Sequence, residues 1–197
     1  MLESYPEIQL DALGELANIG SGNAATALSS MLGRPVDISL PMALALPIAD
    51  AVEAAGAPDA VVTAVALPLV GDLEAIALLL FTAQDSRALC GLLGVEVDSE
   101  VGISALAEIG NILGTSYVGA LSQMTGLALE PRPPETTTDM LGAVVSSVLV
   151  SSVQETDIVL LLDSKLSVGG SECSLSFILA PGQGGVEKIL ARLGLTR

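Results

Sequence analysis

The sequence contains no histidine and no tryptophan, and only 2% of its residues are aromatic. Without histidine, the common zinc sites and every nucleophile that relies on a histidine base are excluded. The two cysteines, Cys90 and Cys173, are far apart in the sequence and stand in apolar surroundings, so we expect them to be core residues. Any chemistry must therefore use carboxylates, amides, hydroxyls or the groups of a partner.

Positive charge is also scarce, since 7 basic residues stand against 23 acidic ones and the net charge is −16 at pH 7. Such a chain has no general field that attracts phosphate backbones, and it has few aromatic rings on which bases could stack. We therefore expect no nucleic-acid binding. The acidic balance serves solubility or favours a basic partner surface, and net charge alone does not separate these interpretations.

Long hydrophobic runs are missing too, although 51% of the residues are hydrophobic. A membrane-spanning helix needs about 18 or more consecutive apolar residues. The stretch 60–81 is interrupted by Asp72 and Glu74, and the N-terminal segment lacks the basic region and apolar core of a signal peptide. We expect a cytoplasmic protein without membrane insertion.

Two long segments, 6–32 and 100–125, repeat their apolar residues with a helical period. Gly33 and Gly126 follow them as helix stops. Each segment contains internal glycines, among them Gly20 and Gly22, which weaken a helix. Because both segments keep the period through their glycines, we predict two continuous amphipathic helices.

The remaining elements repeat in the same order after each long helix. In the first half we predict a strand at 35–40, an irregular link after Pro41, a helix at 49–55, a hairpin of strands 60–70 and 73–82, and a helix at 84–93. In the second half we predict a strand at 127–130, a proline-rich linker over 131–139, a helix at 140–150, strands at 157–168 and 172–180, and a helix at 186–193. The predicted fold class is α/β (α+β), with one domain over 1–197 built from two repeats, about 6–94 and 99–194. We expect a pseudo-twofold, mostly antiparallel sheet with the two long helices on one face.

A polar pattern occurs once in each half. The first copy consists of Asp11, Glu15, Asn18 and Pro41, and the second of Ser104, Glu108, Asn111 and Pro134. Adding 93 to positions 15, 18 and 41 gives 108, 111 and 134. The first three members of each copy have the spacing that stacks side chains on one face of a helix. A single Glu-x-x-Asn pattern matches often by chance, but two complete copies at a constant offset indicate a function.

Both copies match the signature of the CheC, CheX and FliY family of chemotaxis phosphatases, which the sequence resembles over essentially its whole length. That signature is Asp or Ser, three residues, Glu, two residues, Asn, and then Pro after 22 more. Two complete copies resemble the CheC branch, since CheX-type members carry one such site. A chain of this branch needs no cofactor of its own.

The resemblance implies hydrolysis of the aspartyl phosphate on the response regulator CheY, whose own Mg²⁺ takes part. Asn18 and Asn111 would orient the attacking water, and Glu15 and Glu108 would pair with a lysine of the regulator. Among the supporting residues, Asp11 and Ser104 would cap, orient or make peripheral contacts, while Pro41 and Pro134 would shape the loop beside each helix. The resemblance also implies the deamidase CheD as a partner, and the internal repeat makes a monomer sufficient.

Three other interpretations remain open. A binding module would sequester phosphorylated CheY or CheD with little turnover. A flagellar-switch component is disfavoured because we expect no further domain after residue 197. A small-molecule enzyme is disfavoured because no glycine-rich phosphate loop follows a predicted strand.

Overall fold

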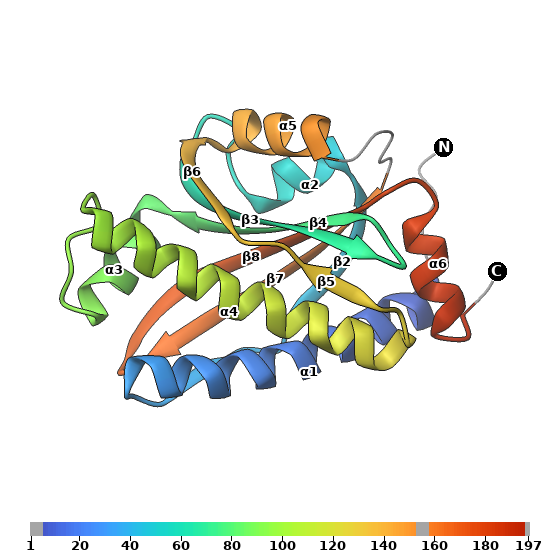
Figure 1. Cartoon of the computed structure of the whole chain (residues 1–197), viewed down its shortest axis with the longest axis horizontal. Coiled ribbons are helices and arrows are strands. Elements are labelled where there is room, and N and C mark those ends of the chain that lie inside the picture. The colour runs from blue at the N-terminus through green and yellow to red at the C-terminus, as the bar shows by residue number, and fades with distance from the viewer. Residues whose placement is uncertain (1–5, 153–157, 196–197) are drawn as a thin grey trace.

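The computed structural model of the protein describes residues 6–152 and 158–195. The elements in this part of the chain are α1 (Glu7–Leu32), β1 (Val36–Ile38), β2 (Met42–Pro47), α2 (Ile48–Ala55), β3 (Val61–Gly71), β4 (Ala75–Thr82), α3 (Ala83–Leu92), α4 (Glu100–Thr125), β5 (Leu129–Pro131), β6 (Glu135–Met140), α5 (Leu141–Ser152), β7 (Ile158–Val168), β8 (Ser171–Pro181) and α6 (Gly185–Arg192). The long helices α1 and α4 lie against one face of the sheet, while α2 and α5 cover the other (Figure 1). None of the described helices is both long and apolar enough to cross a membrane.

The sheet is antiparallel at every described pairing and combines strands from both halves of the chain. Its order is β1-β7-β8-β4-β3-β5, with β2 also on β7 and β6 also on β3. The hairpins β3–β4 and β7–β8 meet at the centre through β4 and β8. Each hairpin then receives the two short strands of the other half at its outer edge. This exchange confirms the predicted duplicated, pseudo-twofold sheet.

The two segments that we expected to be irregular form strands, so that expectation was wrong. Both β1 and β2 pair with β7, where Ile38 lies opposite Leu166 and Met42 opposite Asp163. Between these two pairs, three residues of the edge segment lie opposite only two residues of β7. The extra residue makes a β-bulge. The same shift separates β5 and β6 along β3 in the segment 131–139. Proline is tolerated here because an edge strand or bulge does not need every N–H for the ladder.

Hydrophobic cores fill both spaces between the sheet and its helices. Along β3, Val65, Leu67 and Leu69 belong to the core under α1 and α4. The alternating residues Val62, Ala64 and Ala66 belong to the core under α2 and α5. Because helices cover both faces of the sheet, β3 is apolar at nearly every position. Strands of this kind account for the high hydrophobic fraction without a membrane segment.

The helices α1 and α4 cross in direct contact. A Cβ atom added at Gly20 would lie 2.5 Å from Cδ1 and 3.0 Å from Cα of Tyr117, so only glycine allows this approach. The Tyr117 hydroxyl lies 3.0 Å from Ser21 Oγ, which itself donates to the carbonyl oxygen of Ala17. Burial raises the pKa of Tyr117, whose neutral hydroxyl can therefore donate to Ser21. Both long helices are continuous, as predicted, and α1 ends at Gly33 with a left-handed φ of 62°.

Candidate functional site

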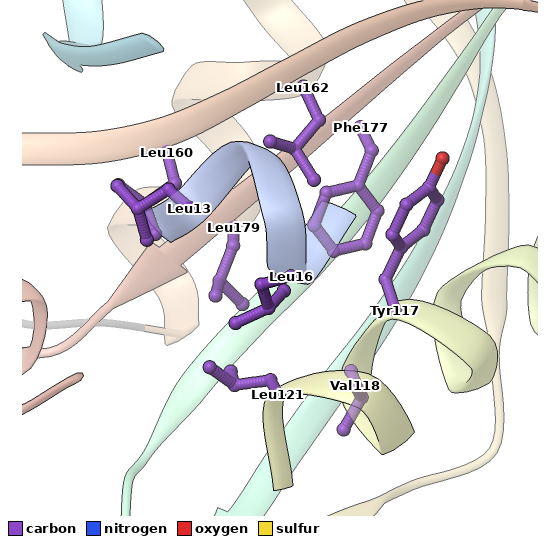
Figure 2. A pocket seen from close by; sticks show the side chains of 9 residues that line it. All are labelled: Leu13, Leu16, Tyr117, Val118, Leu121, Leu160, Leu162, Phe177 and Leu179. Carbon is purple, nitrogen blue, oxygen red and sulfur yellow. The ribbon is translucent and has the colours of Figure 1, made fainter. Parts of the chain in front are cut away.

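An apolar cavity of about 20 Å³ lies inside the core between α1, α4 and strands β7 and β8. Figure 2 shows leucine side chains such as Leu13 and Leu160 around it, with the hydroxyl of Tyr117 pointing away from them. A space of this size holds about one water molecule, and its apolar lining offers that water no hydrogen-bond partner. It is a packing defect and offers no binding site for a polar ligand.

The first copy of the polar pattern lies on the solvent face of α1. Asp11, Glu15 and Asn18 are all exposed. The opposite face of the helix is buried and includes Leu13 and Ala17. The spacing therefore predicted the shared, accessible face correctly.

The second copy lies on the solvent face of α4 in the same way, with one difference. Ser104 and Glu108 are exposed, whereas Asn111 is only half-buried. The buried face of this helix includes Leu106 and Leu113. The second asparagine is thus less accessible than the first.

The two Glu–Asn pairs do not come together into one centre. The helices run in opposite directions (Figure 1), and in the sequence each pair precedes its helix's residue at the close contact, which is Gly20 on α1 and Tyr117 on α4. Gly20 of α1 lies beside Tyr117 of α4. Because the helices are antiparallel, Asn111, six residues before Tyr117, lies beside position 26 of α1, six residues after Gly20. Position 26 is eight residues, or about 12 Å of helix axis, beyond Asn18. The structure therefore contains two separate candidate sites.

Of the roles suggested for Asp11 and Ser104, the structure excludes helix capping, while orientation and peripheral contacts stay predictions. The N-cap of α4 is Ser99, whose Oγ accepts a hydrogen bond of 3.0 Å from the Gly102 amide, and α1 begins after Pro6. Asp11 and Ser104 therefore cap neither helix and present their side chains to solvent one turn before each glutamate.

The prolines of the pattern lie in the bulged links between the short edge strands, Pro41 between β1 and β2 and Pro134 between β5 and β6. Pro41 is buried and Pro134 is half-buried. Helix α1 packs against β1 and β2, and α4 packs against β5 and β6. Each proline therefore belongs to the edge that supports its own motif helix.

The polar groups of both pairs are free to meet a partner. Within residues 6–152 and 158–195, no ion pair or hydrogen bond engages the side chains of Glu15, Asn18, Glu108 or Asn111. An exposed carboxylate can accept hydrogen bonds from a cationic side chain, and a carboxamide both donates and accepts. Each helix thus offers an anion and an amide one turn apart.

Comparison with known proteins agrees with this arrangement. The family model described as the CheC-like family matches residues 8–42 and 101–137, which contain the two copies of the pattern. The chain is also 31% identical over 198 residues to the CheY-P phosphatase CheC of Bacillus subtilis (strain 168), covering 95% of each sequence. The protein belongs to the CheC-like family.

Solved structures share the fold at lower sequence identity. The crystal structure of Thermotoga maritima FliY matches with a TM-score of 0.76 and 18% identity, over 100% of both chains. A chain in the CheX–CheY–BeF3–Mg²⁺ complex of Borrelia burgdorferi matches with a TM-score of 0.51 and 17% identity, over 86% of this chain and 97% of that one. These matches confirm the predicted fold class.

Proposed function

We propose that this protein is a chemotaxis phosphatase that hydrolyses the aspartyl phosphate of a CheY-type response regulator. The observation that carries the proposal is the Glu–Asn pair on the solvent face of both long helices, fully exposed on α1 and with Asn111 half-buried on α4, whose side chains have no internal partner in the described residues. A relative with 31% identity is a CheY-P phosphatase, which supports the same reaction.

The proposed chemistry needs few groups from this chain. An aspartyl phosphate is a reactive acyl phosphate, so catalysis consists mainly of positioning a water in line with phosphorus and stabilising charge. Asn18 or Asn111 enters the regulator's site, and its carboxamide orients the attacking water. The regulator supplies Mg²⁺ and a lysine, which stabilise the charge on the phosphoryl oxygens.

The glutamates act as docking residues in this proposal. Glu15 and Glu108 each precede an asparagine by one helical turn on the same exposed face. Each carboxylate pairs with a lysine of the regulator and so fixes the approach of the asparagine. A rigid helix holds the two side chains at constant spacing, and the absence of histidine is no obstacle because no general base from this chain is required.

A binding module is the second candidate function, in which the same surfaces sequester phosphorylated CheY without turnover. The half-buried Asn111 favours this alternative at the second site, because a less accessible amide reaches a phosphoryl group less well. CheD remains an expected further partner, for which we would test the exposed faces of α2 and α5 first.

The decisive experiment measures phosphate loss from a phosphorylated CheY-type regulator. The wild type, Asn18→Ala, Asn111→Ala and the double variant are compared after circular dichroism has confirmed their folding. We expect the wild type to accelerate phosphate loss and the double variant not to. A wild type that binds the regulator without accelerating the loss, even with CheD added, would replace the enzyme with the sequestering module.

A further inference from the structure

The glycines of α1 fall into two groups. Gly20 is required by packing, since an added Cβ would collide with Tyr117. Gly14 and Gly22 have no such reason, because an added Cβ at either position would meet nothing within 4 Å. Neither has the positive φ that favours glycine. Both lie inside a helix, where alanine is more stable than glycine, so the fold alone does not explain them.

Their positions relate them to Asn18. Gly14 precedes Asn18 by four residues and Gly22 follows it by four, so the glycines occupy the same helix face, one turn on either side of the amide. In α4 the corresponding neighbours of Asn111 are Ala107 and Thr115. The Thr115 hydroxyl donates to the carbonyl oxygen of Asn111 at 2.7 Å, and so occupies the turn that Gly22 leaves empty in α1.

We propose that Gly14 and Gly22 are specificity-determining positions of the Asn18 site. They leave room for the loops of the regulator around its phosphorylated aspartate to touch the backbone of α1. This inference rests on the proposed phosphatase function and adds the kind of surface that the site accepts, namely one that closely surrounds the asparagine.

The physical reason is the short reach of asparagine. Neighbours at i±4 on a helix have Cβ atoms about 5–6 Å from that of the central residue. Side chains at both neighbouring turns would therefore meet the same partner loops that the amide must enter. Removing them lets the partner's backbone pack more closely around the amide, which tightens the docked complex. At the second site, Ala107 and Thr115 keep the partner further away.

The test measures the Asn18 site alone, in an Asn111→Ala background. Gly14→Ala and Gly22→Ala are each compared with Gly91→Ala, a control on α3, where an added Cβ also meets nothing within 4 Å. We expect each of the two α1 changes to raise the unfolding midpoint by about 2–4 °C, because alanine favours the helix. We also expect each to raise KM for the phosphorylated regulator by about five- to tenfold with kcat retained, because the added methyl group overpacks the docked interface. Gly91→Ala leaves KM unchanged.

A mirror experiment uses the second site alone, in an Asn18→Ala background. Thr115→Gly should lower KM there while it lowers the unfolding midpoint, a combination that a purely structural role does not produce. An unchanged KM in both α1 variants, with active parent proteins, overturns the inference and leaves the proposed function intact.

Parent proteins that are inactive together with the wild type refute the phosphatase itself. The same variants are then tested for binding to a beryllofluoride-activated CheY-type regulator. If the two α1 variants bind more weakly than Gly91→Ala, this supports the proposal that Gly14 and Gly22 leave room for the regulator around Asn18, even without turnover. Equal binding, or no binding by any of the proteins, overturns it.

Discussion

The substitution Gly20→Ala tests how closely the two long helices are packed. The new Cβ would lie 2.5 Å from Cδ1, 3.2 Å from Cε1 and 3.0 Å from Cα of Tyr117. The ring is itself buried, with its centroid 4.8 Å from that of the tilted Phe177 ring, and the Cα is backbone, so neither can move aside cheaply. Overpacking of this kind costs about 1–3 kcal/mol or more. The higher helix propensity of alanine returns about 1 kcal/mol.

We therefore expect Gly20→Ala to lower the free energy of unfolding by up to about 2 kcal/mol, and the unfolding midpoint by up to about 8 °C for a protein of this size. The assay is urea unfolding followed by circular dichroism. Gly119→Ala on α4 is the matched control, because an added Cβ there meets nothing within 4 Å and should stabilise. If Gly20→Ala is as stable as Gly119→Ala, the close crossing of α1 and α4 is incorrect.

Three further predictions concern the core, a helix cap and pH. Leu113→Ala empties a fully buried position of α4 and should cost about 2–5 kcal/mol in urea unfolding, and a loss below ~1 kcal/mol would contradict the packing. Ser99→Ala removes the acceptor of the Gly102 amide and should cost about 1 kcal/mol, whereas Ser99→Asp, which keeps a cap, should cost less. Burial raises the pKa of Cys90 above its ordinary 9.0 and that of Tyr117 above 10.0, so the unfolded chain loses these protons first and stability should fall as the pH rises above 9.0. In Tyr117→Phe, the free energy of unfolding should fall less steeply with pH above pH 10.0. An unchanged dependence on pH would contradict the contribution of Tyr117.

The elements that the sequence predicted well are those whose signal is local. The helices α1 and α4 have an apolar period over many turns, and the two hairpins are β-rich, largely apolar runs with glycine at the turn. Strands β2 and β6 gave no such signal. Met42 pairs with Asp163, far along the chain, and β6 is largely exposed with threonine at three positions. The prolines in these two segments predict breaks, because proline usually ends a strand. The bulge of an edge strand nevertheless accommodates them.

The same distinction applies to the candidate site. The spacing of Glu15 and Asn18 was sufficient to place both on one accessible face, because helix geometry fixes it. The half-burial of Asn111 depends on the surroundings of α4, which sequence spacing does not encode. The two kinds of glycine in α1 look identical in the sequence, and only the position of Tyr117 separates Gly20 from Gly22.

The exchange of strands determines how variants of the two sites should be interpreted. Asn18 and Asn111 are about 12 Å apart along the helix axes and share no partner among the described residues, so substitutions there should act independently. The supports of the helices are shared, because α1 packs against β1 and β2, which pair with β7 from the other half of the chain. A change in either hairpin core should therefore disturb both sites together. Loss of activity at one site alone then identifies a residue that meets the regulator, whereas equal loss at both identifies one that supports the fold.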